Sequence, residues 1–260
     1  MRSAHGKGLS ALLFLLLAVL WMAFFPQALL AEPYGSLLSD LGAPLFCGVA
    51  AFLLWRGAWK LPRGPRASWR AATVGCIAAF TVAVNNLPWH ALFVGTARLT
   101  APLPAFFLFA LLCLSVASVE ELIFRGILLP LLLDRFAAAR GGRLLAVLLS
   151  AAIFGLSHLV NLFQGADPAA TLLQVGYSFL IGCVAAVIYL LTRRILWPIL
   201  FHAVYNFGGL LVSRLGEGKI LDTPTVILTV AIGASAAVFL AVSFFCGGQA
   251  SEKTPKISKN

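Results

Sequence analysis

Near its middle the chain reads Ser118-Val119-Glu120-Glu121-Leu122-Ile123-Phe124-Arg125-Gly126. Two carboxylates and one guanidinium here interrupt a run that is otherwise apolar from Ala101 to Leu133. A charged side chain at the centre of a bilayer costs at least ~2.5 kcal/mol on insertion scales. Three such charges in one membrane helix need partners or a function. The stretch therefore predicts a functional site inside a membrane-spanning helix.

Composition supports a membrane protein. Of the 260 residues, 61% are hydrophobic and only 11% are charged, and the mean hydropathy is +0.96. A soluble domain has roughly 25% charged residues. The expected fold class is all-α, a polytopic membrane helix bundle.

Eight apolar segments are candidate transmembrane helices. They cover residues 9–31, 41–55, 71–87, 102–133, 144–161, 170–192, 195–213 and 224–246. We expect the first to be a retained span and not a cleaved signal peptide, because it is long enough to cross a bilayer. We predict one transmembrane domain over residues 1–246, with a catalytic core at about 102–213. The polar, lysine-rich tail at 247–260 is predicted to be disordered and cytoplasmic.

Basic residues are distributed unevenly between the predicted loops. The net charge of +10 would favour nucleic acid in a soluble protein, but these residues lie in short segments between apolar runs. In the eight-span arrangement they gather on the side that holds the N-terminus, above all in the loop between Arg56 and Arg70. The positive-inside rule then places both termini in the cytoplasm. We expect the lipid bilayer as a partner and no nucleic acid.

The two adjacent glutamates have different expected roles. Glu121 and Arg125 are four residues apart on a helix, with the acid on the N-terminal side, so they can form an ion pair on one face. Glu120 points about 100° away and has no basic partner within its own helix. Such an unmatched carboxylate is typical of a general base, although hydrogen bonding to a neighbouring helix is the alternative.

Two of the four histidines lie inside predicted spans. His158 follows Phe154 by one helical turn, and Asn206 follows His202 by one turn. Together with Glu120, these residues supply a base, a polar group that holds a water (His158) and two donors from one helix face (His202 and Asn206). That set suits hydrolysis of an amide through an activated water and an oxyanion site in a low-dielectric pocket.

The same side chains offer a metal alternative. Two histidines and one glutamate, here Glu120, His158 and His202, form a known catalytic zinc ligand set. The adjacent glutamates would then have to act as ligand and base, although neighbouring positions on a helix diverge. We favour a metal-free mechanism with no cofactor and keep zinc as the alternative.

The motifs resemble a known family. Glu120-Glu121-x-x-x-Arg125, Phe154-x-x-x-His158 and His202-x-x-x-Asn206 occur in this order on three successive membrane segments. The set resembles the signature of the CPBP family, which comprises CAAX proteases and bacteriocin-processing enzymes, also called Abi proteins. The family is related to the Ras-converting CAAX endopeptidase.

The resemblance implies an intramembrane endopeptidase with eight helices, which has been described both as a metalloprotease and as a glutamic protease. By position, Glu120 is the general base, His158 helps to hold the water, and His202 and Asn206 form the oxyanion site. Glu121 and Arg125 brace the helix, and Phe154 is a supporting residue.

The implied substrate is a membrane-associated protein or peptide. A prenylated CAAX protein, a bacteriocin precursor, a peptide pheromone and a C-terminal sorting tail all fit. We expect a multi-pass protein of the bacterial inner (plasma) membrane. The alternatives are a non-catalytic peptide-binding or immunity membrane protein and a small transporter whose Glu and His relay protons.

One further cluster lies outside these motifs. Asn85-Asn86-Leu87-Pro88-Trp89 ends the predicted third span. We interpret it as a helix stop with an interfacial Trp, in preference to part of a substrate entrance.

Overall fold

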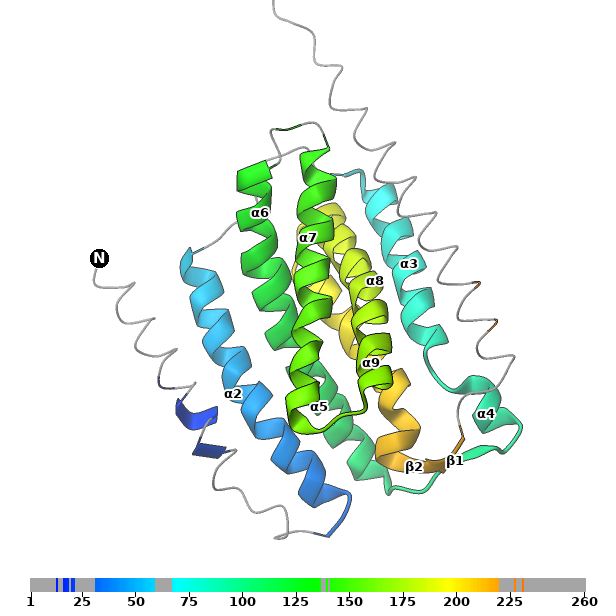
Figure 1. The fold of residues 1–260 in the computed structure, drawn as a ribbon. Helices are drawn as coiled ribbons and strands as arrows, with labels where there is room; N and C mark the ends of the chain where they lie inside the picture. Colours follow the sequence, from blue (N-terminus) through cyan, green and yellow to red (C-terminus); the bar gives the residue numbers. More distant parts are fainter. Residues whose placement is uncertain are drawn as a thin grey trace, which may run out of the picture.

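The computed structural model describes residues 31–58, 67–136, 139 and 141–219, together with the helical residues 13, 16–18, 20, 21, 227 and 231. Almost all of the predicted first span (9–31) and last span (224–246), and all of the tail at 247–260, lie outside the described residues. The rest forms a bundle of helices (Figure 1).

The described chain is predominantly helical, which confirms the predicted fold class. Its helices are α2 (Tyr34–Ala58), α3 (Trp69–Asn85), α4 (Trp89–Phe93), α5 (Leu103–Glu121), the π-helical η2 (Leu122–Leu128), α6 (Leu129–Phe136), α7 (Gly142–Ser157), the 3₁₀-helical η3 (His158–Gln164), α8 (Pro168–Thr192) and α9 (Leu196–Leu215).

Five helical stretches in the described part are long and apolar enough to cross a membrane. They are Tyr34–Arg56, Leu103–Phe136, Gly142–Phe163, Pro168–Thr192 and Leu196–Leu215. α3 is apolar but shorter. These helices correspond to six of the eight predicted spans, so the described residues establish a helical membrane bundle without establishing eight crossings.

Local sequence signals explain where α8 begins and ends. Asp167 caps its N-terminus by accepting a hydrogen bond from the backbone N–H of Ala170 at 2.8 Å. Pro168 occupies the first helical position, where its missing N–H costs nothing. The helix ends at Arg193, whose left-handed backbone (φ 54°) stops the α-helical hydrogen bonding.

The helix that carries the quoted stretch is irregular. α5, η2 and α6 follow one another without a break from Leu103 to Phe136. The π-helical turn begins directly after Glu121, and the N–H of Leu129 bonds the carbonyl of Phe124 five residues earlier. Pro130, whose ring would collide with the carbonyl four residues before it in an α-helix, follows this wide turn. The irregularity thus falls next to the charged residues, as π-helical turns often do at functional sites.

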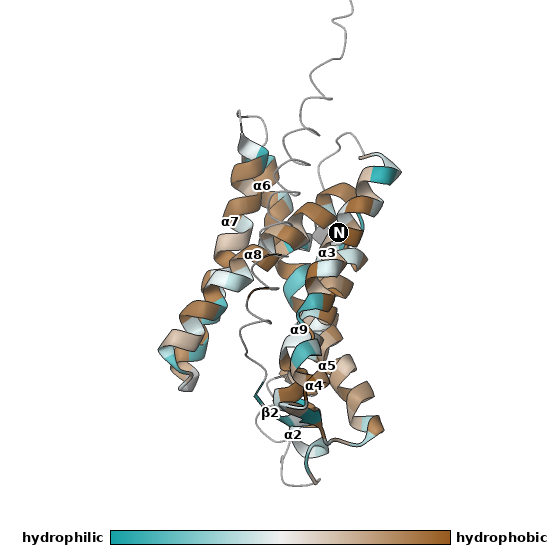
Figure 2. Ribbon diagram, turned by 90° about the vertical axis from the view of Figure 1, so that its right-hand side faces the viewer, coloured by the Kyte–Doolittle hydropathy of each residue, from teal (hydrophilic) through white to brown (hydrophobic). Residues whose placement is uncertain are grey.

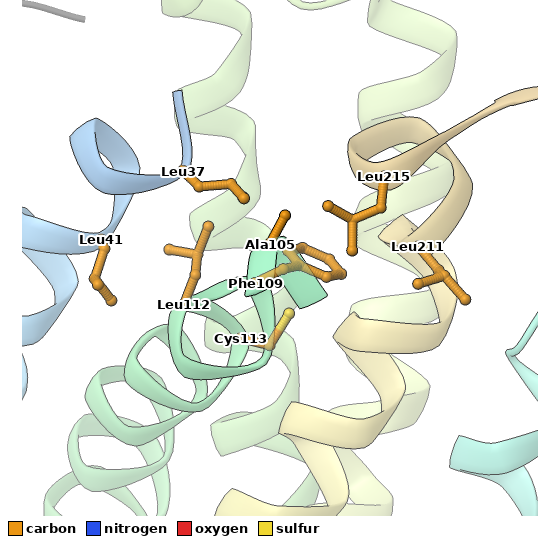
Figure 3. Packing of buried hydrophobic residues seen from close by; sticks show 8 residues of the cluster. All are labelled: Leu37, Leu41, Ala105, Phe109, Leu112, Cys113, Leu211 and Leu215. Atoms are coloured by element: carbon orange, nitrogen blue, oxygen red, sulfur yellow. The ribbon is translucent and has the colours of Figure 1, made fainter. Parts of the chain in front are cut away.

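One apolar cluster joins α2, α5 and α9. Leu37 and Leu41 of α2 face α5, and Leu211 and Leu215 of α9 pack on its other side (Figure 3). The α5 side chains between them are Ala105, Phe109, Leu112 and Cys113. α7 and α8 form a hairpin, and α3 packs against α8 and α9. The outer surfaces of these helices are largely hydrophobic (Figure 2), as a lipid-facing surface requires.

A short antiparallel ribbon ties the ends of two helices together. Strand β1 (Ala97–Leu99) precedes α5, and strand β2 (Gly216–Gly218) follows α9. Arg98 and Glu217 form an exposed ion pair across the ribbon at 2.7 Å. The ribbon therefore fixes the lower ends of α5 and α9 side by side (Figure 1).

Candidate active site

A buried ion pair lies at the junction of α5 and η2. Nη1 of Arg125 is 2.9 Å from Oε1 of Glu121, and both side chains are 0% exposed. The guanidinium also lies over the ring of Phe154 in α7, 4.5 Å from its centroid. Its Nε and Nη2 have no hydrogen-bond partner among the described residues. The face of Phe154 therefore supplies a cation–π contact in place of those hydrogen bonds.

Glu121 also forms a hydrogen bond with a second helix, α9. Nδ1 of His202 in α9 lies 2.9 Å from the same Oε1 atom. A carboxylate paired with Arg125 can only accept, so the Nδ1–H of His202 is the donor. This contact joins residues 81 positions apart and fixes which imidazole nitrogen faces the adjacent glutamate.

Glu120 faces the other nitrogen of the same ring. Its Oε2 is 3.4 Å from Nε2 of His202, and its side chain is 27% exposed, against 0% for Glu121. The separation is long for a hydrogen bond. One carboxylate is therefore buried and bonded through Oε1 to Arg125 and His202, while the other remains accessible beside the imidazole.

His158 lies where α7 gives way to η3 and is half-buried. Its Nδ1 is 3.1 Å from the carbonyl oxygen of Phe154. A carbonyl only accepts, so this contact assigns the proton to Nδ1 and leaves Nε2 with a lone pair. The Phe154 ring meets both imidazoles edge on, with centroids 5.2 Å from His158 and 5.7 Å from His202. Phe154 thus contacts both histidines.

Asn206 lies one turn beyond His202 on α9 and is half-buried. Within the described part of the chain its side-chain amide makes no hydrogen bond. The amide is therefore available to a ligand.

A residue outside the predicted site positions this part of α9. Nδ2 of Asn86 donates to the carbonyl of Tyr205 at 2.8 Å. Asn86 directly follows α3, which ends at Asn85, and Trp89 is exposed. The interpretation as a helix stop thus describes the local structure, but it missed the contact with α9. The only signal in the sequence was a pair of amides at the end of an apolar segment.

The structure brings most of the predicted residues together. Glu120, Glu121, Arg125 and His202 are in direct contact, and Phe154 joins Arg125, His158 and His202. Sequence reasoning treated Glu121 only as the partner of Arg125 and missed its bond to His202. No spacing rule relates residues on two helices that are distant in sequence.

The alternative zinc ligand set is not assembled in this structure. Among the described residues, no three His, Cys, Asp or Glu side chains lie close enough to hold a metal ion. The ring of Phe154 packs edge on against both His158 and His202, and Glu121 occupies Nδ1 of His202. The donor set of Glu120, His158 and His202 therefore does not fit a shared ion here.

Comparison with known proteins agrees with the motifs. Residues 100–208 match the family described as Type II CAAX prenyl endopeptidase Rce1-like. The match includes every predicted site residue from Glu120 to Asn206. No curated protein and no solved structure shows significant similarity to the chain.

Proposed function

Because residues 100–208 match the family described as Type II CAAX prenyl endopeptidase Rce1-like, we propose that this integral membrane protein is a metal-free intramembrane endopeptidase. Its substrate is a peptide bond of a membrane-associated protein or peptide. One observation carries the mechanism: Glu120 remains partly exposed beside His202, whereas Glu121 is buried and bonds both Arg125 and His202 through Oε1.

Glu120 acts as the general base. Within the described part of the chain its carboxylate has one polar contact, the long one to His202, so a water can bind to it without displacing a strong partner. General bases contribute typically 10²–10⁴-fold to rate.

His158 orients that water. Since its Nδ1–H is donated to Phe154, the lone pair of Nε2 can accept a hydrogen bond from the water. Glu120 takes one water proton and Nε2 of His158 accepts the other as a hydrogen bond, which aims an oxygen lone pair at the substrate carbonyl.

His202 and Asn206 stabilise the oxyanion. A protonated His202 and Arg125 balance the two carboxylates, so the cluster is electrically neutral with His202 as an imidazolium. A neutral cluster is the less costly arrangement at a buried site. The Nε2–H of His202 and the amide of Asn206 then donate hydrogen bonds to the developing oxyanion. Preorganised donors at this position lower the free energy of the transition state.

The reaction proceeds in two steps. The water oxygen bonds to the carbonyl carbon as its proton passes to Glu120, and the carbonyl electron pair moves to the oxyanion. The oxyanion then collapses, the carbon–nitrogen bond breaks, and Glu120 returns its proton to the departing nitrogen. A carboxylic acid and an amine leave, and the enzyme is restored.

Cleavage of a library of membrane-proximal peptides by detergent-purified protein tests this proposal. We expect wild-type cleavage to persist in a strong zinc chelator, and Glu120→Gln and Asn206→Ala to lose it while remaining folded. Loss in chelator with recovery on adding zinc would overturn the metal-free mechanism. If Asn206→Ala and Glu120→Gln cleave like wild type, the assignment of these residues is wrong. A wild type that binds peptides but cleaves none would favour a peptide-binding protein.

A further inference from the structure

An apolar groove lies apart from the site described above. It has a volume of about 360 Å³ and opens between α3, the end of α8 and the start of α9. Cys76, Ile77 and Phe80 line it from α3, with Thr192 from α8 and Trp197 from α9. In a membrane-spanning bundle an apolar groove of this kind suits the hydrocarbon chains of lipids.

Basic residues lie close in sequence to residues that line one end of this groove. Arg70 is two residues before Ala72, which also lines the groove, and Arg193 and Arg194 directly follow Thr192. Arg70 and Arg194 are exposed. The start of α3 and the end of α8 lie at the same end of the bundle (Figure 1).

An exposed Trp beside these arginines is typical of the membrane interface. Trp69 is 73% exposed, and the guanidinium of Arg70 lies 5.5 Å from its ring centroid. Trp side chains concentrate at the level of the lipid headgroups. This end of the groove is therefore placed at headgroup depth, and its apolar part lies at acyl-chain depth.

We propose that the groove is a binding site for an anionic phospholipid. One acyl chain lies against Ile77 and Phe80, and the phosphate is bound by Arg70 and Arg194. Basic pockets between transmembrane helices take such headgroups, and an apolar groove excludes a free phosphate, which has no apolar part. This inference is independent of the proposed peptidase activity.

The lipid would also touch the helix that carries His202. Phe80 packs edge on against Trp197 at 6.3 Å and against Phe201 at 6.4 Å. Phe201 is fully buried and directly precedes His202. A lipid on Phe80 and Trp197 therefore packs against the first turns of α9 and stabilises them.

Retention of lipid by the purified full-length protein tests the site. Native mass spectrometry and thermal unfolding are measured with phosphatidylglycerol and with phosphatidylcholine of identical acyl chains. We expect the wild type to retain phosphatidylglycerol preferentially and to melt at a higher temperature with it. The double variant Arg70→Gln/Arg194→Gln should weaken retention about thirtyfold. The two arginines contribute about equally to the binding of an anionic lipid, so each accounts for about a five- to sixfold effect.

Two further variants separate the site from general surface charge. Arg135→Gln/Arg143→Gln removes two exposed arginines at the same end of the bundle, outside the groove, and should retain phosphatidylglycerol like wild type. Thr73→Phe places a large side chain in the groove from an exposed position and should reduce retention of both lipids. Equal weakening by the two arginine pairs, equal retention of the two lipids by wild type, or unaltered retention in Thr73→Phe would each overturn the proposal.

Discussion

Glu120 and Glu121 are neighbours in the chain, yet their carboxylates meet very different surroundings. Glu121 lies between Arg125 and His202 with no exposure, while Glu120 keeps part of its surface open and approaches the same imidazole from the other side. The same chemical change should therefore lower mainly turnover at Glu120 and mainly stability at Glu121.

Glu120→Gln should abolish turnover and spare the fold. Glutamine has nearly the same shape but cannot accept the water proton, so we expect turnover to fall by ~10²–10⁴-fold, the usual contribution of a general base. The melting temperature should change little, because among the described residues the one polar contact of the Glu120 side chain is the long one to His202. Peptide cleavage and thermal unfolding in one detergent measure both effects. Turnover within a few-fold of wild type would remove Glu120 from the reaction.

Glu121→Gln should destabilise the protein. The substitution leaves the guanidinium of Arg125 buried without a counter-charge, and breaking a buried pair in this way costs ~3–5 kcal/mol. It also takes the charged acceptor from Nδ1 of His202. Thermal or denaturant unfolding should show a clear loss relative to Glu120→Gln, which is the matched control. Equal stability of the two variants would contradict the assigned division of roles.

Spacing along the chain could predict only some of these contacts. The interval of four between Glu121 and Arg125 is the helical period, so their pairing follows from local geometry. The bonds from Glu121 to His202 and from Asn86 to Tyr205 join separate helices, and these depend on how the helices pack. The sequence marked His202 as important but could not indicate which of its nitrogens meets which carboxylate.

At the scale of elements, close approach of α7 and α8 holds Phe154 and Arg125 in place. A Cβ at Gly155 would lie 2.8 Å from the carbonyl oxygen of Val175, a backbone atom of α8. A Cβ at Gly182 would lie 2.9 Å from Nη2 of Arg125. Small residues at such contacts allow membrane helices to pack closely.

Gly155→Ala should destabilise the hairpin of α7 and α8. The added methyl group collides with backbone, which cannot move aside as a side chain can, and overpacking costs typically ~1–3 kcal/mol. Gly176→Ala is the control, because a Cβ there meets nothing within 4 Å and alanine is the better helix former. Unfolding of the two variants should differ in sign, with only Gly155→Ala less stable than wild type. A neutral Gly155→Ala would mean that α7 and α8 pack less tightly than described.

The boundaries of the helices were largely predictable where the sequence contains capping residues. Asp167 and Pro168 mark the start of α8, and apolar runs mark each long helix. The π-helical turn over residues 122–128 was not predictable, because Pro130 is the residue there that disturbs an α-helix and the widened turn precedes it. The sequence shows that Pro130 disturbs the helix. The packing of other helices around Arg125 helps to determine that the π-helical turn forms before the proline.

At the scale of the whole molecule, charge divides the bundle into two ends. One end carries the β ribbon with the Arg98–Glu217 pair and the contact between Arg214 and Asp40 at 2.7 Å. The opposite end carries exposed Arg135 and Arg143 without a described ion pair. Balanced charge at one end and excess positive charge at the other is the pattern from which the positive-inside rule assigns the cytoplasmic side.

Cysteine labelling in intact cells tests this orientation. Glu217→Cys and Arg143→Cys are introduced separately into a variant whose native cysteines are replaced by alanine, and both positions are exposed. A membrane-impermeant maleimide should label Glu217→Cys in intact cells and Arg143→Cys only after permeabilisation. The reverse pattern would show that the bundle is inserted the other way round, with the ribbon in the cytoplasm. Either orientation leaves the contacts of Glu120 and His202 unchanged, but it decides from which compartment the hydrolytic water and the polar part of a substrate arrive.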